Sequence, residues 1–318
     1  MVVMNKIKSF FRLVRWPNLL MIAVMMCLTY YCLMLPLSVS DVMGVMPAPP
    51  AFGLLLISMI FIAAGGYVIN DLYDINADSV NRPERLLVTK AFSEKETKFF
   101  YNILTAIGLV AALVSSVLVS ETKFVTLFAL LVLLVCVLRS YSSTYKKRLV
   151  IGNIIVSLSV AFAMFLPWLF EMFYLSSNVL ILSAVKNVML YILRFVLIYT
   201  AFAFITTLIR EIIKDAEDCE GDAATRCRTI PVVYGIRNTK IILYVLIAVL
   251  LIFLFAYEYI ILKLELYVAS AIIALVLLCS SVLIVKVYKA KDKNDFHMAS
   301  NISKLMMAIG LLSILFLI

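Results

Sequence analysis

The chain has 318 residues, of which 64% are hydrophobic and 15% are charged, and its mean hydropathy is +1.08. A soluble protein of this length must cover its surface with polar groups, so this composition excludes a water-soluble fold and predicts contact with lipid along most of the chain. The apolar runs are continuous rather than alternating, and glycine and proline are rare, which excludes a β-barrel and predicts an all-α membrane protein.

The apolar runs predict nine membrane-spanning helices, because a helix of about 20 residues crosses the hydrocarbon core. In chain order, the predicted spans cover residues 17–37, 51–69, 99–120, 124–138, 149–170, 188–209, 241–257, 266–285 and 303–318. A basic segment from Met4 to Trp16 precedes the first span and predicts a helix that lies flat on the membrane surface. No separate soluble domain is recognisable, so residues 1–318 are expected to form a single transmembrane domain.

The basic residues are distributed unequally between the two sides of this topology. The side that holds the N-terminal arm carries 24 Lys and Arg residues, and the opposite side carries 4. By the positive-inside rule, the N-terminus and the basic loops are expected to face the cytoplasm. The net charge of +9 therefore indicates topology, and a nucleic-acid partner is not expected.

Two of the predicted cytoplasmic loops are unusually acidic, and they follow the second and sixth spans. In each loop three aspartates stand at positions i, i+3 and i+7; they are Asp71, Asp74 and Asp78, and Asp215, Asp218 and Asp222. If the helices continue through the loops, each trio lies on one helical face, where like charges repel unless a cation neutralises them. Carboxylate ligands without His or Cys suit Mg²⁺, and a diphosphate is a natural partner for the metal. A solvated acidic rim is the structural alternative, but the repeated spacing favours two metal sites.

These loops resemble the two aspartate-rich motifs of the UbiA-type intramembrane prenyltransferase superfamily. The first family motif, N-D-x-x-D-x-x-x-D followed by N-R-P-x-R, is matched by Asn70, Asp71, Asp74, Asp78, Asn81, Arg82, Pro83 and Arg85. The second, K-D-x-x-D-x-x-G-D with a trailing T-x-P-V and glycine, is matched by Lys214, Asp215, Asp218, Gly221, Asp222, Thr229, Pro231, Val232 and Gly235. The resemblance extends over the whole chain through helix number and loop placement.

The resemblance implies Mg²⁺-dependent transfer of an isoprenyl group from a prenyl diphosphate to a lipophilic acceptor, in a helix bundle around a cavity open to the cytoplasm of a bacterial or archaeal cell. It implies one Mg²⁺ at Asn70, Asp71, Asp74 and Asp78, and a second at Asp215, Asp218 and Asp222, with Mn²⁺ as a possible substitute. Asp71, Asp74, Asp215 and Asp218 are the implied catalytic residues. The expected diphosphate contacts are Arg82, Arg85, Lys146 and Lys214.

The acceptor is less well specified than the donor. After Arg85 the chain departs from the common family pattern R-P-I-P-x-G, which leaves a prenylglycerol phosphate or an aromatic acid as the expected acceptor. The segment from Arg15 to Ile22 resembles the digeranylgeranylglycerol-phosphate synthase branch and favours the lipid. Asn153 is a candidate for acceptor contact, whereas Arg194 is expected to snorkel to the membrane surface and His297 to be a surface residue.

Two other classes of membrane protein remain as alternatives to a prenyltransferase. A CDP-alcohol phosphotransferase also uses aspartates and divalent metals, but its D-G-x-x-A-R segment is absent from the sequence. A divalent-cation carrier would place acids within the spans, and here the predicted spans are nearly free of charge. The sequence does not specify the donor chain length or the oligomeric state.

Overall fold

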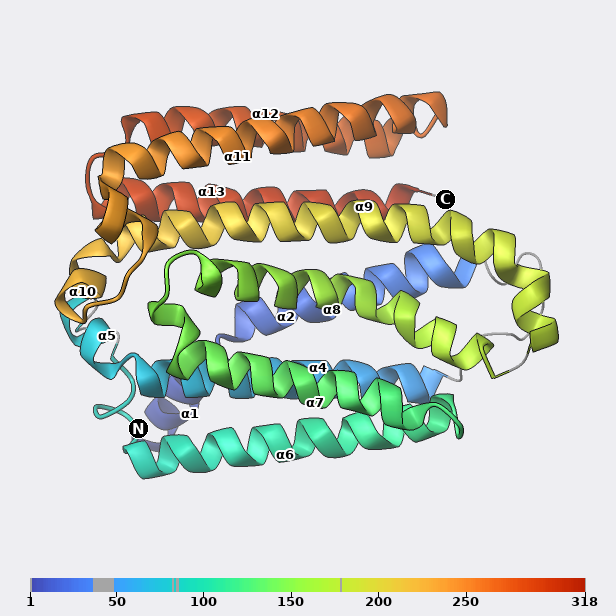
Figure 1. Ribbon diagram of the computed structural model, residues 1–318, viewed down its shortest axis with the longest axis horizontal. Helices are drawn as coiled ribbons and strands as arrows, with labels where there is room; N and C mark the ends of the chain where they lie inside the picture. The colour runs from blue at the N-terminus through green and yellow to red at the C-terminus, as the bar shows by residue number, and fades with distance from the viewer. Residues whose placement is uncertain (1, 37–48, 82, 84–85, 178, 318) are drawn as a thin grey trace.

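The computed structural model describes residues 2–36, 49–81, 83, 86–177 and 179–317, and this part of the chain is helical. The helices are α1 (Val2–Leu13), α2 (Trp16–Cys27), α4 (Pro49–Tyr73), α5 (Ile75–Asn81), α6 (Glu94–Val119), α7 (Phe124–Ser143), α8 (Ile151–Leu175), α9 (Val179–Glu217), α10 (Cys219–Ala224), α11 (Ile230–Lys263), α12 (Tyr267–Lys289) and α13 (Lys293–Leu312). A π-helical segment, η1 (Leu28–Met34), extends α2, and 3-10 turns form η3 (Tyr145–Lys147) and η4 (Ser313–Phe316). Figure 1 shows the long helices running side by side as a bundle.

Within the described residues, nine helical segments are long and apolar enough to cross a membrane, which confirms the predicted number of spans. Their ends differ from the prediction, because charged residues continue several helices beyond the apolar core. The sixth span was expected over residues 188–209, but α9 covers 39 residues and ends at Glu217. The ninth was expected from residue 303, but α13 begins at Lys293, where the Asp292 side chain caps it.

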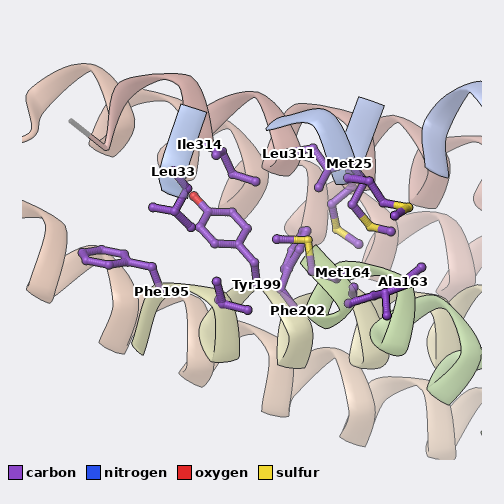
Figure 2. Close-up of a cluster of buried hydrophobic side chains, with 14 of the residues drawn as sticks. Met25, Leu33, Ala163, Met164, Phe195, Tyr199, Phe202, Leu311 and Ile314 are labelled. Atoms are coloured by element: carbon purple, nitrogen blue, oxygen red, sulfur yellow. The ribbon is translucent and has the colours of Figure 1, made fainter. Parts of the chain in front are cut away.

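The centre of the bundle is filled by large apolar side chains from elements that are distant in sequence. Figure 2 shows Leu33 of the first span beside Tyr199 of α9, and Met25 of the same span on the side of Met164 of α8. Such packing holds helices together in lipid, where the hydrophobic effect does not drive helices toward each other. The predicted cavity open to the cytoplasm stays a prediction.

Small residues bring α4 and α6 close together. A Cβ added to Gly65 of α4 would lie 2.8 Å from Thr105 Oγ1, and one added to Gly108 of α6 would lie 2.9 Å from Ile62 Cγ1. Close backbone approach at small residues is a typical mode of helix association in membranes. The packing fixes α4, whose end carries the first acidic motif.

The predicted basic helix at the N-terminus is present as α1. It exposes Ile7 and Phe11, which are 54% and 53% accessible, and it buries Leu13 at its end. Arg15 then adopts a left-handed backbone conformation with φ 52°, and α2 starts at the next residue. Its position flat on the membrane surface stays a prediction.

Both acidic motifs lie at the same end of the bundle. Figure 1 shows α5 and α10 next to each other at this end, beyond the ends of α4 and α9, and the C-terminus near the opposite end. The two chain segments that carry the predicted metal ligands are therefore neighbours in space.

The predicted orientation can be tested by chemical labelling. A single cysteine introduced by Leu264→Cys, between α11 and α12, should react with a membrane-impermeant maleimide in intact cells, because this loop lies on the side poor in Lys and Arg. The matched variant Lys291→Cys, between α12 and α13, should react only after the cells are opened. Both are made in a background without the native cysteines. The reverse pattern would show that the orientation is inverted.

Candidate active site

Each acidic motif interrupts its helix at the middle aspartate of the trio. Helix α4 ends at Tyr73 and α5 begins at Ile75, while α9 ends at Glu217 and α10 begins at Cys219. The interruptions are small, because the amide of Asp78 still donates to the Asp74 carbonyl at 2.8 Å. The corresponding bond in the second motif, from Asp222 to Asp218, measures 3.1 Å. The expected continuous helices are therefore replaced by two matching helix–break–helix segments.

Basic and amide side chains contact two carboxylates of the first motif. Arg15 Nη2 lies 2.7 Å from Asp71 Oδ1, although Arg15 precedes the first span and Asp71 lies at the end of the second. Lys146 from η3 forms an ion pair with Asp74 Oδ2, to which the Asn70 amide also donates at 2.6 Å. Lys146, a predicted diphosphate contact, thus points into the first motif.

The second motif has a different set of partners. Asn153 Nδ2 of α8 donates to Asp215 Oδ2 at 2.7 Å, so Asn153 orients a predicted metal ligand. Lys214, a predicted diphosphate contact, lies 3.3 Å from Glu211, which also accepts from Arg210 at 2.9 Å. In the structure Lys214 therefore points toward the preceding turn of α9, and its role with a diphosphate stays a prediction.

Asn81 connects the two motifs. Its side-chain amide donates to the Asp218 carbonyl at 3.0 Å, and its Oδ1 accepts from the Gly221 amide at 2.9 Å. Lys293 at the start of α13 also donates to the Asn81 carbonyl. One side chain of α5 thus holds α10 at a fixed distance from the first motif.

We call the two hydrogen bonds that join Asn81 to Asp218 and Gly221 the Asn81 clamp. The clamp predicts a specific steric effect. In Gly221→Ala the new Cβ would lie 2.3 Å from Asn81 Nδ2, so we expect a loss of about 1–3 kcal/mol of stability, greater than the gain of about 1 kcal/mol from removing a helical glycine. In an Asn81→Ala background the space is free, and the same change should be neutral or slightly stabilising. A double-mutant cycle of unfolding in detergent measures the coupling. Equal effects in both backgrounds would contradict the clamp.

Two aspartates outside the membrane spans are difficult to ionise. Burial, together with Asp74 and Asp71, raises the pKa of Asp78 to about 6. Burial also raises the pKa of Asp222 to about 6, with a further contribution from Asp218. A bound cation would favour the charged form of both carboxylates and lower their pKa.

The donor atoms suit a hard cation. The amide oxygen Asn70 Oδ1 is buried and has no hydrogen-bond partner in the part of the chain that the structure describes. An unpartnered amide oxygen beside carboxylates is a suitable ligand for Mg²⁺. Among the described residues, no three acidic, histidine or cysteine side chains are close enough to enclose a metal ion as they stand. Asp71 and Asp74 form ion pairs with Arg15 and Lys146. Metal binding therefore requires these carboxylates to leave the ion pairs or to bind both partners.

The raised pKa values predict that protons compete with Mg²⁺. The folded pKa of about 6 for Asp78 and Asp222 exceeds the usual value of 3.8, so without metal the folded state loses stability as the pH rises from about 4 to 7. Bound Mg²⁺ should offset this loss, since ligands must be deprotonated. We expect Mg²⁺ to raise the Tm more at pH 8 than at pH 5, measured by thermal unfolding in detergent. An equal rise at both pH values would contradict the expectation.

Several site contacts involve residues that the sequence motifs did not assign. Arg15 and Asn153 act on aspartates 56 and 62 residues away. His297, expected to be a surface residue, has a side chain that is 44% accessible and lies 3.0 Å from Glu217 at the end of α9. Tyr141 lies near Lys146, Asp74 and Asp215, and Arg194 is exposed on α9. The predicted diphosphate ligands Arg82 and Arg85 lie outside the described residues.

The sequence is similar to those of known proteins and matches the model of one family. A sequence model of the UbiA prenyltransferase family matches residues 33–305. Digeranylgeranylglyceryl phosphate synthase from Methanococcus maripaludis is 32% identical over 197 residues, which cover 61% of this chain and 60% of that protein. The protein of the same name from Sulfurisphaera tokodaii is 31% identical and covers 76% of each chain. The match to the first of these relatives spans about three fifths of its length.

A solved structure has the same fold. The UbiA homologue from Archaeoglobus fulgidus, determined bound to GPP and Mg²⁺, aligns with 96% of this chain and 99% of its own, with a TM-score of 0.55 and 20% identity. At this level of identity the likeness establishes the helical fold, and it confirms the predicted fold class.

Proposed function

Because this chain belongs to the UbiA prenyltransferase family, we propose that it transfers an isoprenyl group from a prenyl diphosphate to a prenylglycerol phosphate, with Mg²⁺ as cofactor. The observation that carries the proposal is the meeting of both aspartate motifs at one end of the bundle, where Asn81 bonds them together. The names of the relatives support the lipid acceptor, and the homologue bound to GPP and Mg²⁺ supports the donor class and the metal. Family membership also separates the chain from the phosphotransferase and carrier alternatives.

The reaction places its main demand on charge stabilisation. Breaking the allylic C–O bond leaves negative charge on the departing diphosphate, and fixed cations aimed at that charge lower the barrier. Bound Mg²⁺ would supply most of this stabilisation, held by the two aspartate trios and Asn70 Oδ1. The chain itself positions the Lys146 ammonium at the first trio and orients Asp215 through Asn153.

The location of the site suits lipid substrates. The motifs include the last turns of α4 and α9, so a diphosphate at the motifs leaves its isoprenoid tail directed toward the apolar part of the bundle. An acceptor with a polar head and prenyl tails would enter in the same orientation. Both reacting groups would then lie at the level of the membrane surface.

The proposal is tested with purified protein in lipid vesicles. Labelled prenyl diphosphates of several chain lengths are combined with a prenylglycerol phosphate, the same prenylglycerol without phosphate, and aromatic acids, and the lipid products are separated. We expect a Mg²⁺-dependent product with the prenylglycerol phosphate and none with excess chelator. Product formed only from an aromatic acid, or equally well with chelator, would overturn the proposed acceptor or the proposed cofactor respectively.

A further inference from the structure

A second group of polar residues lies on α9, over the two helical turns that lead into the second aspartate motif and end at its Lys214. Thr207, Arg210, Glu211 and Lys214 are spaced so that they share one face of the helix. Helix α13 packs against α9 and brings the half-buried Lys304 to this face, where Arg210 and Lys214 are close enough to repel its ammonium group. We call these five residues the α9–α13 cluster.

The α9–α13 cluster has an excess of positive charge. The charged groups that act most strongly on Lys304 are three cations, Arg210, Lys214 and Arg15, and one carboxylate, Glu211. Glu211 is already shared, since Arg210 lies 2.9 Å from it and Lys214 3.3 Å. Three cations of the cluster therefore surround one carboxylate in a partly buried setting, where unbalanced charge is costly. An anion of about two charges would balance them.

The α9–α13 cluster also contains hydrogen-bond donors that are not used. Arg210 Nε and Thr207 Oγ1 are both buried, and neither has a hydrogen-bond partner within the described part of the chain. Leaving a buried donor unsatisfied costs about 1–3 kcal/mol, so such groups are rare unless they serve a ligand. A ligand with several acceptor oxygens would satisfy both.

We infer that the α9–α13 cluster binds the phosphate group of the acceptor lipid. This inference rests on the proposed function and adds to it a binding site for the acceptor head group. A phosphomonoester carries about −1.5 to −2 charges at neutral pH and presents three acceptor oxygens, whereas an aromatic carboxylate carries a single charge. Arginine and lysine together are the residues expected at such a group.

The α9–α13 cluster lies beside the first motif, because Arg15 pairs with Asp71 and also acts on Lys304. Lys146 and Asp74 mark the first motif on the α4 and η3 side, where the donor diphosphate is expected. The cluster lies on the α9 and α13 side and precedes Asp215 along α9 toward the middle of the membrane. Lys214, which the motif comparison assigned to the donor, then serves the acceptor.

The first test uses Lys304→Gln, which removes one charge and keeps most of the side-chain volume. Its KM for the prenylglycerol phosphate should rise about tenfold to a hundredfold, the effect of losing one charged hydrogen bond to an ionic ligand, while the KM for the donor stays within about twofold. Lys304→Arg should restore the acceptor KM. Lys289→Gln, an exposed lysine at the end of α12, is the matched control and should behave as the unsubstituted protein. An unchanged acceptor KM, or an equal effect on the phosphate-free prenylglycerol, would overturn the inference.

A binding measurement distinguishes failure of the inference from failure of the proposed function. Equilibrium binding of labelled prenylglycerol phosphate is measured with excess chelator and without donor, for the unsubstituted protein, Lys304→Gln and Thr207→Val. Weaker binding by both variants, with unchanged Tm, would support the site even if no acceptor were prenylated. Undiminished binding by both variants would exclude the site even if the unsubstituted protein formed the lipid product.

Discussion

Asp215→Asn and Asp71→Asn should each lower the turnover number by about a hundredfold or more, because each removes one negative charge from a ligand set that serves the departing diphosphate. The structure indicates that the fold tolerates the change at position 215, whereas Asp71→Asn removes the carboxylate that pairs with Arg15 and should lower the Tm. An asparagine at position 215 can still accept the Asn153 hydrogen bond through its amide oxygen, and relief of repulsion within the trio stabilises the metal-free helix slightly. Initial rates at saturating Mg²⁺ and the Tm in detergent measure the two effects.

The controls for these variants are carboxylates outside the trios. Glu220→Gln changes an exposed residue of α10 between two predicted metal ligands, and Glu94→Gln changes an exposed residue at the start of α6. Exposed charges remain hydrated and contribute little to their surroundings, so both controls should alter the rate by less than about threefold. Similar small effects in all four variants would favour the solvated acidic rim over a metal site.

Lys146→Gln should lower kcat/KM for the donor by about a hundredfold, since Lys146 provides a partly buried positive charge at the first motif. Lys147→Gln is the matched control, because its side chain is the exposed neighbour in the same turn. The loss should be mainly in kcat if Lys146 stabilises charge that develops during the reaction, and mainly in KM if it only binds the ground state. A loss of less than about threefold would show that Lys146 does not contribute to the reaction.

The same variant has an expected effect on stability that the metal should reverse. Without Lys146, the carboxylate of Asp74 loses its ion-pair partner in a partly buried position, and breaking such a pair leaves an uncompensated charge. The Tm of Lys146→Gln should therefore be lower than that of the unsubstituted protein in chelator, and Mg²⁺ should reduce the difference. A difference unaffected by Mg²⁺ would indicate that the cation does not reach Asp74.

The nine spans and the two acidic motifs could be predicted from the sequence because both depend on local patterns. A run of apolar residues defines a span whatever its neighbours are, and the spacing of the aspartates places them on one helical face. The ends of the spans were less predictable. Helix α9 continues through Arg210, Glu211 and Lys214 because these charges pair with one another, which a search for uncharged runs does not detect.

The contacts that organise the site depend on packing between distant segments. Nothing in the spacing of the first motif indicates that Asp71 meets Arg15, or that Asn153 meets Asp215. The break at Asp74 and Asp218 was also missed, since the i, i+3, i+7 pattern is compatible with an unbroken helix. These features follow from the arrangement of the bundle, which local periodicity does not encode.

The Asn81 clamp also bears on the order in which the protein is made. Asn81 and Asp218 are 137 residues apart, so the ribosome must deliver four more spans to the membrane before the two motifs can join. Parts of a protein generally form in the order of synthesis. The first aspartate motif is therefore present without the second motif while the next four spans are made. Arg15 precedes Asp71 in the chain and is therefore already in place when the first motif emerges. Arg15 can act as a counter-ion for Asp71 from the start. The incomplete site then carries less unbalanced charge at the membrane surface until the second motif is synthesised.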